Sequence, residues 1–121
     1  IEILGENNNA RLNIFSAKKR IFPLNIDMLE MHPFSSQVFL PMIKADFIVL
    51  VSPKNIKPDL KKIECFKVSS GDGINFKPCV WHFPLISIQD ANYITIDKKE
   101  SQKNIEIYKF VENEKFILNY E

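Results

Sequence analysis

Short stretches in which apolar and polar residues alternate, or in which apolar residues dominate, are spread along most of the chain. Alternation places successive side chains on opposite faces of a β-strand, so it predicts strands with one buried face. The run Phe47–Val51 is apolar throughout and predicts a fully buried strand. The alternation changes phase near Met28, which predicts a β-bulge there. The stretches are 12–17, 23–31, 37–41, 47–51, 74–77, 80–88, 93–97 and 105–110.

Only one stretch has the pattern of a helix. Pro58 opens it, and apolar residues recur three apart at Leu60, Ile63 and Phe66. Proline is favourable in the first turn of a helix, so a short helix over 58–66 is predicted. Many short strands and a single short helix favour an all-β fold, an antiparallel barrel of the jelly-roll type. A small barrel of this kind can hold one ligand in its interior.

The stretch Gly71–Leu85 contains most of the residues with distinctive chemistry. Two glycines flank Asp72, which predicts a tight turn that needs positive φ or a close approach of the backbone. Beyond the turn, Asn75 lies in one predicted strand and His82 in the next, both among apolar residues. A buried polar group is costly unless it is hydrogen-bonded or used. Both residues are therefore candidates for a site in the barrel interior.

The totals fit one ordinary domain. The chain has 121 residues, of which 45% are hydrophobic and 26% are charged, and this is enough for one core. The net charge of +1 leaves no strong field to attract nucleic acid or an anionic membrane. The longest apolar run is too short to span a bilayer, and no signal-peptide pattern is found.

The two cysteines and the first residue carry two further expectations. Cys65 and Cys79 lack the spacing of metal ligands. We therefore expect reduced thiols and a cytoplasmic protein rather than a disulfide. The chain begins with Ile1 and not with methionine, so we expect a single domain that lacks an N-terminal segment.

Seven segments carry a resemblance to a known family. They are Leu29–Pro33, Ser36–Met42, Phe47–Val51, Lys57–Leu60, Gly73–Phe76, Val80–Leu85 and Tyr93–Asp97. In their order and spacing they resemble the ureidoglycolate lyase family. The resemblance implies a cupin-like barrel that acts as a homodimer. It also implies cleavage of ureidoglycolate to glyoxylate and urea in allantoin and purine catabolism.

The chain departs from this family at four polar positions. Met31 stands where the family usually has arginine, and Phe83 stands where it usually has a second histidine. Lys98 replaces an arginine after the strand-end aspartate, and arginine is also common near Ser16. These changes remove charge from places expected to bind a carboxylate. They motivate an alternative function, a non-catalytic or altered-substrate barrel that binds a small organic acid.

The chemistry that the resemblance implies is an elimination. A base takes the proton of the substrate hydroxyl as the C–N bond breaks, and an acid protonates the departing nitrogen. Histidine suits either role, so His82 is the first candidate and His32 the second, with Asp97 expected to orient a histidine. The structural alternatives are that His82 is a hydrogen-bonded histidine of the barrel, that His32 is a strand-end histidine and that Asp97 is a strand-end cap.

Four further side chains are expected to bind the substrate. Asn75 and Gln37 would orient the ureido or hydroxyl group through their amides. Lys77 or Lys44 would meet the substrate carboxylate. Asn75 and Gln37 each have a purely structural alternative, since Asn75 can satisfy a bulge and Gln37 can hold a turn.

A metal site is the remaining alternative for the same residues. His32, His82 and Glu30 would make a set of two histidines and one carboxylate. The chain has 2 histidines in all, and Phe83 replaces the obvious paired ligand. We therefore expect no metal and no other cofactor, and a small carboxylic acid as the partner.

Overall fold

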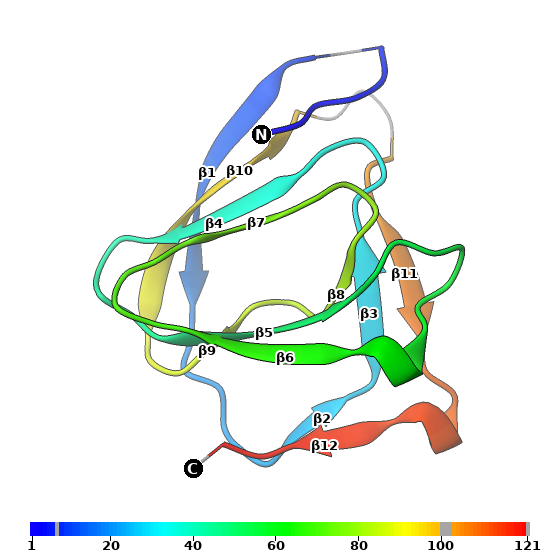
Figure 1. The fold of residues 1–121 in the computed structure, drawn as a ribbon. Helices are drawn as coiled ribbons and strands as arrows, with labels where there is room; N and C mark the ends of the chain where they lie inside the picture. Colours follow the sequence, from blue (N-terminus) through cyan, green and yellow to red (C-terminus); the bar gives the residue numbers. More distant parts are fainter. Residues whose placement is uncertain (7, 100–102, 121) are drawn as a thin grey trace.

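The protein folds as a nearly all-β domain in which every registered strand pair is antiparallel (Figure 1). The computed structural model describes residues 1–6, 8–99 and 103–120. Its strands confirm the predicted all-β, cupin-like fold class. They are β1 Ala10–Ala17, β2 Leu24–Ile26, β3 Met28–Met31, β4 Gln37–Pro41, β5 Phe47–Ser52, β6 Glu64–Val68, β7 Ile74–Phe76, β8 Trp81–His82, β9 Ile86–Ser87, β10 Ala91–Lys98, β11 Glu106–Lys109 and β12 Phe116–Leu118.

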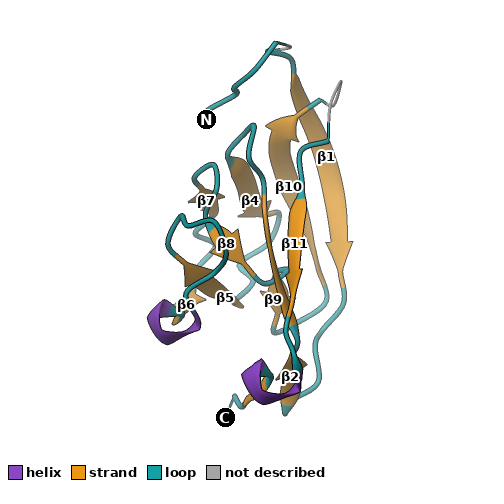
Figure 2. Cartoon of the chain, turned by 90° about the vertical axis from the view of Figure 1, so that its right-hand side faces the viewer, coloured by secondary structure: helices purple, strands orange, loops and turns teal. Residues whose placement is uncertain are grey.

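Two larger sheets form the body of the domain. The first has the strand order β1-β10-β4-β7, and the second has the order β11-β3-β8-β5-β6, with β9 also paired to β5. A two-stranded sheet, β12-β2, lies at the end of the domain where the C-terminus is found, while the N-terminus lies at the opposite end (Figures 1 and 2).

Strand β5 is buried on both faces, as its uninterrupted apolar sequence predicted. Phe47 and Val49 point into a core cluster that also holds Tyr93 of the first sheet. Ile48 and Leu50 point to the opposite side, into a second cluster against which residues of β2 and β12 pack. Alternate side chains of β5 therefore pack into two different cores, and this packing holds β5 and the strands paired with it in place.

The predicted helix over 58–66 is wrong. Leu60–Lys62 form a single 3-10 turn, and Glu64–Val68 form β6. The edge of the buried strand β5 requires a hydrogen-bonding partner, and Phe66 and Cys65 pair with Val49 and Leu50. This pairing overrides the local helical spacing, because an unpaired buried backbone costs more than a weak local preference.

Two other predictions about strands need correction. The phase change near Met28 is a break between two strands and not a bulge, because β2 pairs with β12 whereas β3 pairs with β11 and β8. The predicted strand over 80–88 is divided into β8 and β9. Pro84 lies in the interruption, and proline has no N–H to donate to a sheet.

The predicted turn before β7 is confirmed, and glycine suits its two positions for different reasons. Gly71 has a φ of +81°, a value that residues other than glycine rarely adopt. Gly73 lies against β4, where a Cβ would stand 2.7 Å from the carbonyl oxygen of Phe39.

Both cysteines are free thiols. Across the described residues, no helix is long and apolar enough to cross a membrane.

Candidate active site

A hollow of about 420 Å³ opens between the two larger sheets. From here on it is called the hollow. Most of its wall comes from the first sheet, and Glu30 of β3 comes from the second. Its lining residues are Arg11, Asn13, Ile14, Phe15, Glu30, Gln37, Phe39, Pro84, Leu85, Thr95 and Asp97.

Arg11 and Asp97 form a two-pronged ion pair in the hollow. Arg11 Nε donates to Asp97 Oδ1 at 3.0 Å, and Arg11 Nη2 donates to Asp97 Oδ2 at 3.0 Å. The pair follows from the register of β1 and β10, which places the two residues directly opposite each other. Asp97 therefore holds an arginine, and the prediction that it orients a histidine is wrong.

Glu30 connects the hollow to both histidines, and we call Glu30, His32 and His82 the histidine cluster. Glu30 and His82 are direct partners across β3 and β8, with Glu30 Oε1 at 3.7 Å from His82 Nε2. The rings of His32 and His82 lie 5.2 Å apart between centroids. Neither histidine lines the hollow, so Glu30 is the member of the cluster that faces it.

Backbone carbonyls fix the tautomer of both histidines. His32 Nδ1 lies 2.8 Å from the carbonyl oxygen of Asn104, and His82 Nδ1 lies 3.0 Å from that of Val80. A carbonyl oxygen only accepts, so each Nδ1 carries the hydrogen when the ring is neutral. Each Nε2 then presents a lone pair, and both Nε2 atoms are buried without a hydrogen-bond partner.

Burial sets the protonation of Glu30 and His82. Burial, then the neighbouring His32, lowers the pKa of His82 to about 3, while the bond to the Val80 carbonyl opposes this shift. His82 is therefore neutral at pH 7. Burial raises the pKa of Glu30, and His32 partly offsets that rise. The Glu30–His82 contact is thus not an ion pair at neutral pH, and Glu30 is a stronger base than an ordinary surface carboxylate.

Two residues that the sequence did not single out support the histidines. The ring of Phe76 stacks on His82 at 4.0 Å with an interplanar angle of 5°. The buried side chain of Asn104 accepts from Phe34 N at 2.8 Å and donates to Ser35 Oγ at 2.9 Å. These bonds hold the loop whose carbonyl receives His32. Only the pairing of distant segments reveals either role.

The predicted substrate-binding residues divide into one inside the hollow and three outside. Gln37 lines the hollow. Asn75 is exposed, because it alternates along β7 with the buried Phe76, so its predicted place in the interior is wrong. Lys77 and Lys44 are also exposed and do not line the hollow.

None of the four departures from the family pattern lines the hollow. Met31 and Phe83 belong to the second core cluster, and the buried Lys98 donates through Nζ to the Leu4 carbonyl. Ser16 is exposed and its hydroxyl donates to the Asn92 side chain. The expected loss of charge therefore falls elsewhere, and Arg11 supplies a cation within the hollow.

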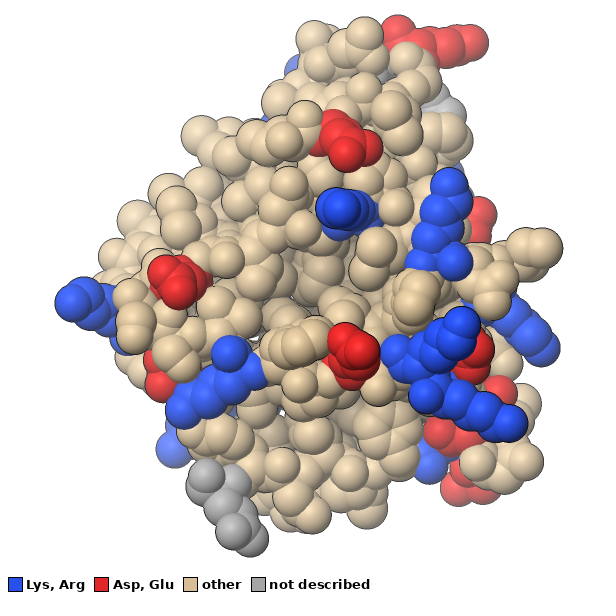
Figure 3. All heavy atoms as spheres, viewed as in Figure 1, with Lys and Arg blue, Asp and Glu red and all other residues tan. Residues whose placement is uncertain are grey.

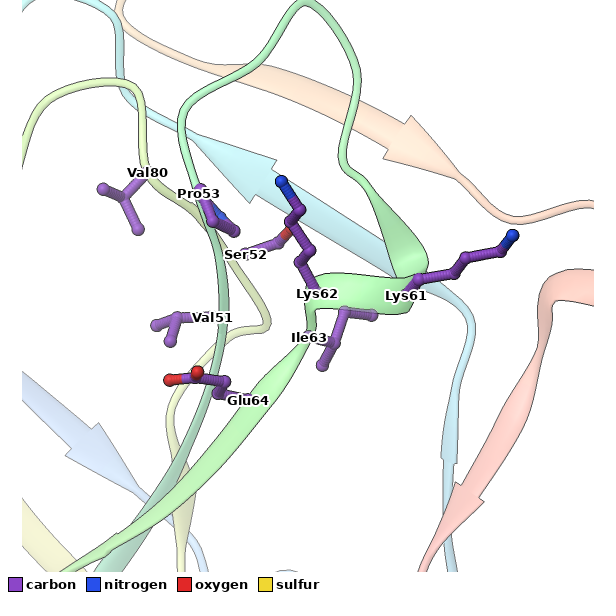
Figure 4. A pocket seen from close by; sticks show the side chains of 8 residues that line it. All are labelled: Val51, Ser52, Pro53, Lys61, Lys62, Ile63, Glu64 and Val80. Atoms are coloured by element: carbon purple, nitrogen blue, oxygen red, sulfur yellow. The ribbon is translucent and has the colours of Figure 1, made fainter.

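A second hollow of about 460 Å³ lies between the end of β5 and the start of β6 (Figure 4). Lys61 points away from the other side chains around it. The second hollow contains no member of the histidine cluster, so we do not assign the chemistry to it. On the face shown in Figure 3, basic and acidic side chains are interspersed, in keeping with the net charge of +1.

Comparison with known proteins finds relatives that match almost the whole length of the chain. The family model described as ureidoglycolate lyase matches residues 1–117. A ureidoglycolate lyase of Pseudomonas paraeruginosa is 33% identical over 120 residues, which are 98% of this chain and 71% of that protein. Proteins of the same name from Stutzerimonas stutzeri and Pseudomonas putida are 31% and 30% identical, over 71% and 72% of their lengths. The chain therefore belongs to the ureidoglycolate lyase family.

Proposed function

We propose that this protein is a urea-releasing ureidoglycolate lyase that converts ureidoglycolate to glyoxylate and urea. One observation carries the assignment beyond the family. The hollow holds a guanidinium, on Arg11, and a carboxyl group with a raised pKa, on Glu30, and two histidine nitrogens with lone pairs lie behind Glu30. A small hydroxy acid needs a cation for its carboxylate and a base for its hydroxyl.

The proposed reaction gives Glu30 the proton transfer. Its carboxylate takes the hydroxyl proton of the substrate, the C–O bond becomes a carbonyl, and the C–N bond breaks. The protonated carboxyl group then gives that proton to the departing nitrogen, so urea leaves neutral and Glu30 is restored. His82 and His32 are assigned a supporting role, because their Nε2 atoms are buried behind Glu30.

Four other residues of the hollow are assigned to binding. Arg11 is placed opposite the substrate carboxylate, since guanidinium and carboxylate match as two-pronged partners. Asp97 already accepts two bonds from Arg11, so its carboxylate competes with that of the substrate for the guanidinium. Gln37 and Thr95 provide an amide and a hydroxyl for the ureido group.

Release of urea and glyoxylate from racemic ureidoglycolate, corrected for spontaneous decay, tests the proposal. We expect Glu30→Gln to lose about 10² to 10⁴ in rate, the usual contribution of general acid–base catalysis. Glu106→Gln is the matched control, because Glu106 is an exposed glutamate on the neighbouring strand β11. A wild-type rate in Glu30→Gln refutes the role of Glu30, and no release by the wild type refutes the function.

A binding protein for a small organic acid is the second candidate. It is favoured by one observation, namely that both Nε2 atoms are closed off from the hollow. Thermal protection by glyoxylate without any release of urea would identify this second function.

We also propose a cytoplasmic homodimer. The two free thiols suit a reducing compartment. Strand β1 is the edge of the first sheet, and Leu12 and Ile14 on it are 70% and 65% exposed. An exposed apolar edge strand is normally covered by a partner. A monomer in sedimentation at micromolar concentration would contradict the dimer, and Ile14→Glu is expected to weaken it.

A further inference from the structure

We propose that the hollow accepts ureidoglycolates with an aryl or alkyl group on the distal ureido nitrogen, and that it binds them more tightly than ureidoglycolate. The distal nitrogen is the one farther from the glycolate carbon. This preference rests on the proposed function and names the substrate class of the same site. The hollow is larger and less polar than ureidoglycolate requires.

A large part of the wall of the hollow is apolar. Every carbon of ureidoglycolate carries an oxygen or a nitrogen, so the molecule has no apolar group to place against such a wall. The volume of about 420 Å³ falls in the range of about 300–1,000 Å³ that drug-sized ligands fill. Ureidoglycolate therefore leaves part of the hollow empty. The apolar lining residues are Ile14, Phe15, Phe39, Pro84 and Leu85.

The register of the first sheet gives the hollow a polar end and an aromatic end. Arg11, Asn13 and Phe15 alternate along β1 and all line the hollow. Arg11 lies opposite Asp97, and Asn13 lies opposite Thr95. Phe15 follows Arg11 at a distance of roughly 13 Å, since a strand rises about 3.3 Å per residue. A substrate as short as ureidoglycolate, held at Arg11, thus ends before Phe15.

The aromatic end consists of two rings in contact. Phe15 and Phe39 meet edge to face, with their centroids 6.1 Å apart and an interplanar angle of 78°. Phe39 is buried and also meets Phe76 edge to face at 6.2 Å. Phe15 remains 43% exposed. An apolar group gains by covering such a surface, and a further ring can stack on these two or meet their edges.

The distal nitrogen of the substrate points toward the aromatic end. We assign the ureido group to Gln37 and Thr95, and Thr95 lies opposite Phe39 in the register of β10 and β4. With its carboxylate at Arg11 and its ureido group at Thr95, the molecule runs from the polar end to the aromatic end. A substituent on its last nitrogen therefore enters the space beside Phe39.

This nitrogen takes no part in the bond changes of the elimination. The hydroxyl proton moves to the nitrogen that is attached to the glycolate carbon, the bond between these two atoms breaks, and the C–O bond becomes a carbonyl. Glyoxylate and the substituted urea are the products, so atoms and charge balance as they do for ureidoglycolate. The substituent changes binding and leaves the chemistry as it is.

Initial rates of glyoxylate release from N′-phenylureidoglycolate and from ureidoglycolate, each corrected for spontaneous decay, test the preference. We expect KM to be at least about tenfold lower for the phenyl compound, since one methylene in an apolar pocket is already worth about 10- to 200-fold. The two kcat values should be similar, because the substituent is bound equally in the ground state and the transition state.

Binding is measured separately with two analogues that cannot react. N-carbamoylglycine and its N′-phenyl derivative lack the hydroxyl group, so they undergo no elimination. In calorimetry their Kd values should differ by at least about the same tenfold, in favour of the phenyl derivative.

Phe15→Ser removes the exposed ring of the aromatic end, so the preference for both phenyl compounds should fall several-fold. Phe66→Ser is the matched control. Phe66 is 49% exposed on β6, which is an edge strand as β1 is, and it does not line the hollow. This control should keep the preference of the wild type, and melting temperatures show whether both variants fold.

Equal KM and Kd values for phenyl and unsubstituted compounds overturn the proposal, and so does a preference that Phe15→Ser leaves intact. Turnover of ureidoglycolate without any preference refutes the aromatic end alone and leaves the lyase in place. Tighter binding of the phenyl analogue without any release of glyoxylate refutes the lyase alone.

Discussion

Arg11 and Asp97 should affect substrate binding in opposite directions when each is replaced by a neutral residue. Arg11→Met removes the cation that we place opposite the substrate carboxylate, so KM should rise. Asp97→Asn leaves the arginine but removes the charge that competes for it, so KM should fall by a few-fold. A merely structural pair would give losses of the same sign in both variants.

The size of the Arg11 effect follows from its surroundings. A hydrogen bond to a charged group is worth about 1.5–3 kcal/mol, and each 1.4 kcal/mol is tenfold in binding. The Arg11 side chain is 42% exposed, and exposure to water weakens such contacts. We therefore expect the lower end, an increase in KM of about 10- to 30-fold for Arg11→Met.

Initial rates of urea release across substrate concentrations, with melting temperatures to check folding, measure both variants. Arg11→Lys keeps the charge but not the two-pronged geometry, so it should lie between the wild type and Arg11→Met. An unchanged KM in Arg11→Met refutes the assignment of Arg11. A rise in KM in both Arg11→Met and Asp97→Asn shows that the pair only supports the fold.

Two further predictions concern stability. Gly73→Ala should lower the free energy of unfolding by about 1–3 kcal/mol in urea denaturation, because the added Cβ would meet the Phe39 carbonyl. Gly71→Ala should lower it by about 1 kcal/mol, because residue 71 has a positive φ. Variants as stable as the wild type would contradict these two reasons. Burial raises the pKa of Tyr93, whose hydroxyl meets Ser87 Oγ. Because the unfolded chain loses this proton first, stability should fall as pH rises above about 10, and a Tyr93→Phe variant that keeps the same slope would refute the cause.

The sequence predicted most strands because their signals are local. Gln37–Pro41 needs only its own alternation to be recognised as a strand. The segment 58–66 misled because apolar residues three apart fit a helix, while the decisive fact was the open edge of β5, which lies elsewhere in the chain. A tertiary partner overrides a weak local preference in such cases.

The site was predicted in part, since its chemistry depends on register. His82, His32 and Glu30 could be named as a set, but their contact requires the pairing of β3 with β8. Asn75 was misplaced because a polar residue beside a turn was given the inward face. Arg11 was missed because nothing in its own segment shows that Asp97 lies opposite it.

Both cluster histidines inherit their tautomer from main-chain oxygens, those of Asn104 and Val80. No side-chain substitution can delete a carbonyl oxygen. The direction in which the two lone pairs point is thus encoded by the path of the backbone, and a substitution changes it only where, as at Asn104, the side chain holds that backbone in place. A lineage can exchange the residues around the hollow, and with them the acid that it binds, while the two Nε2 lone pairs keep the same direction.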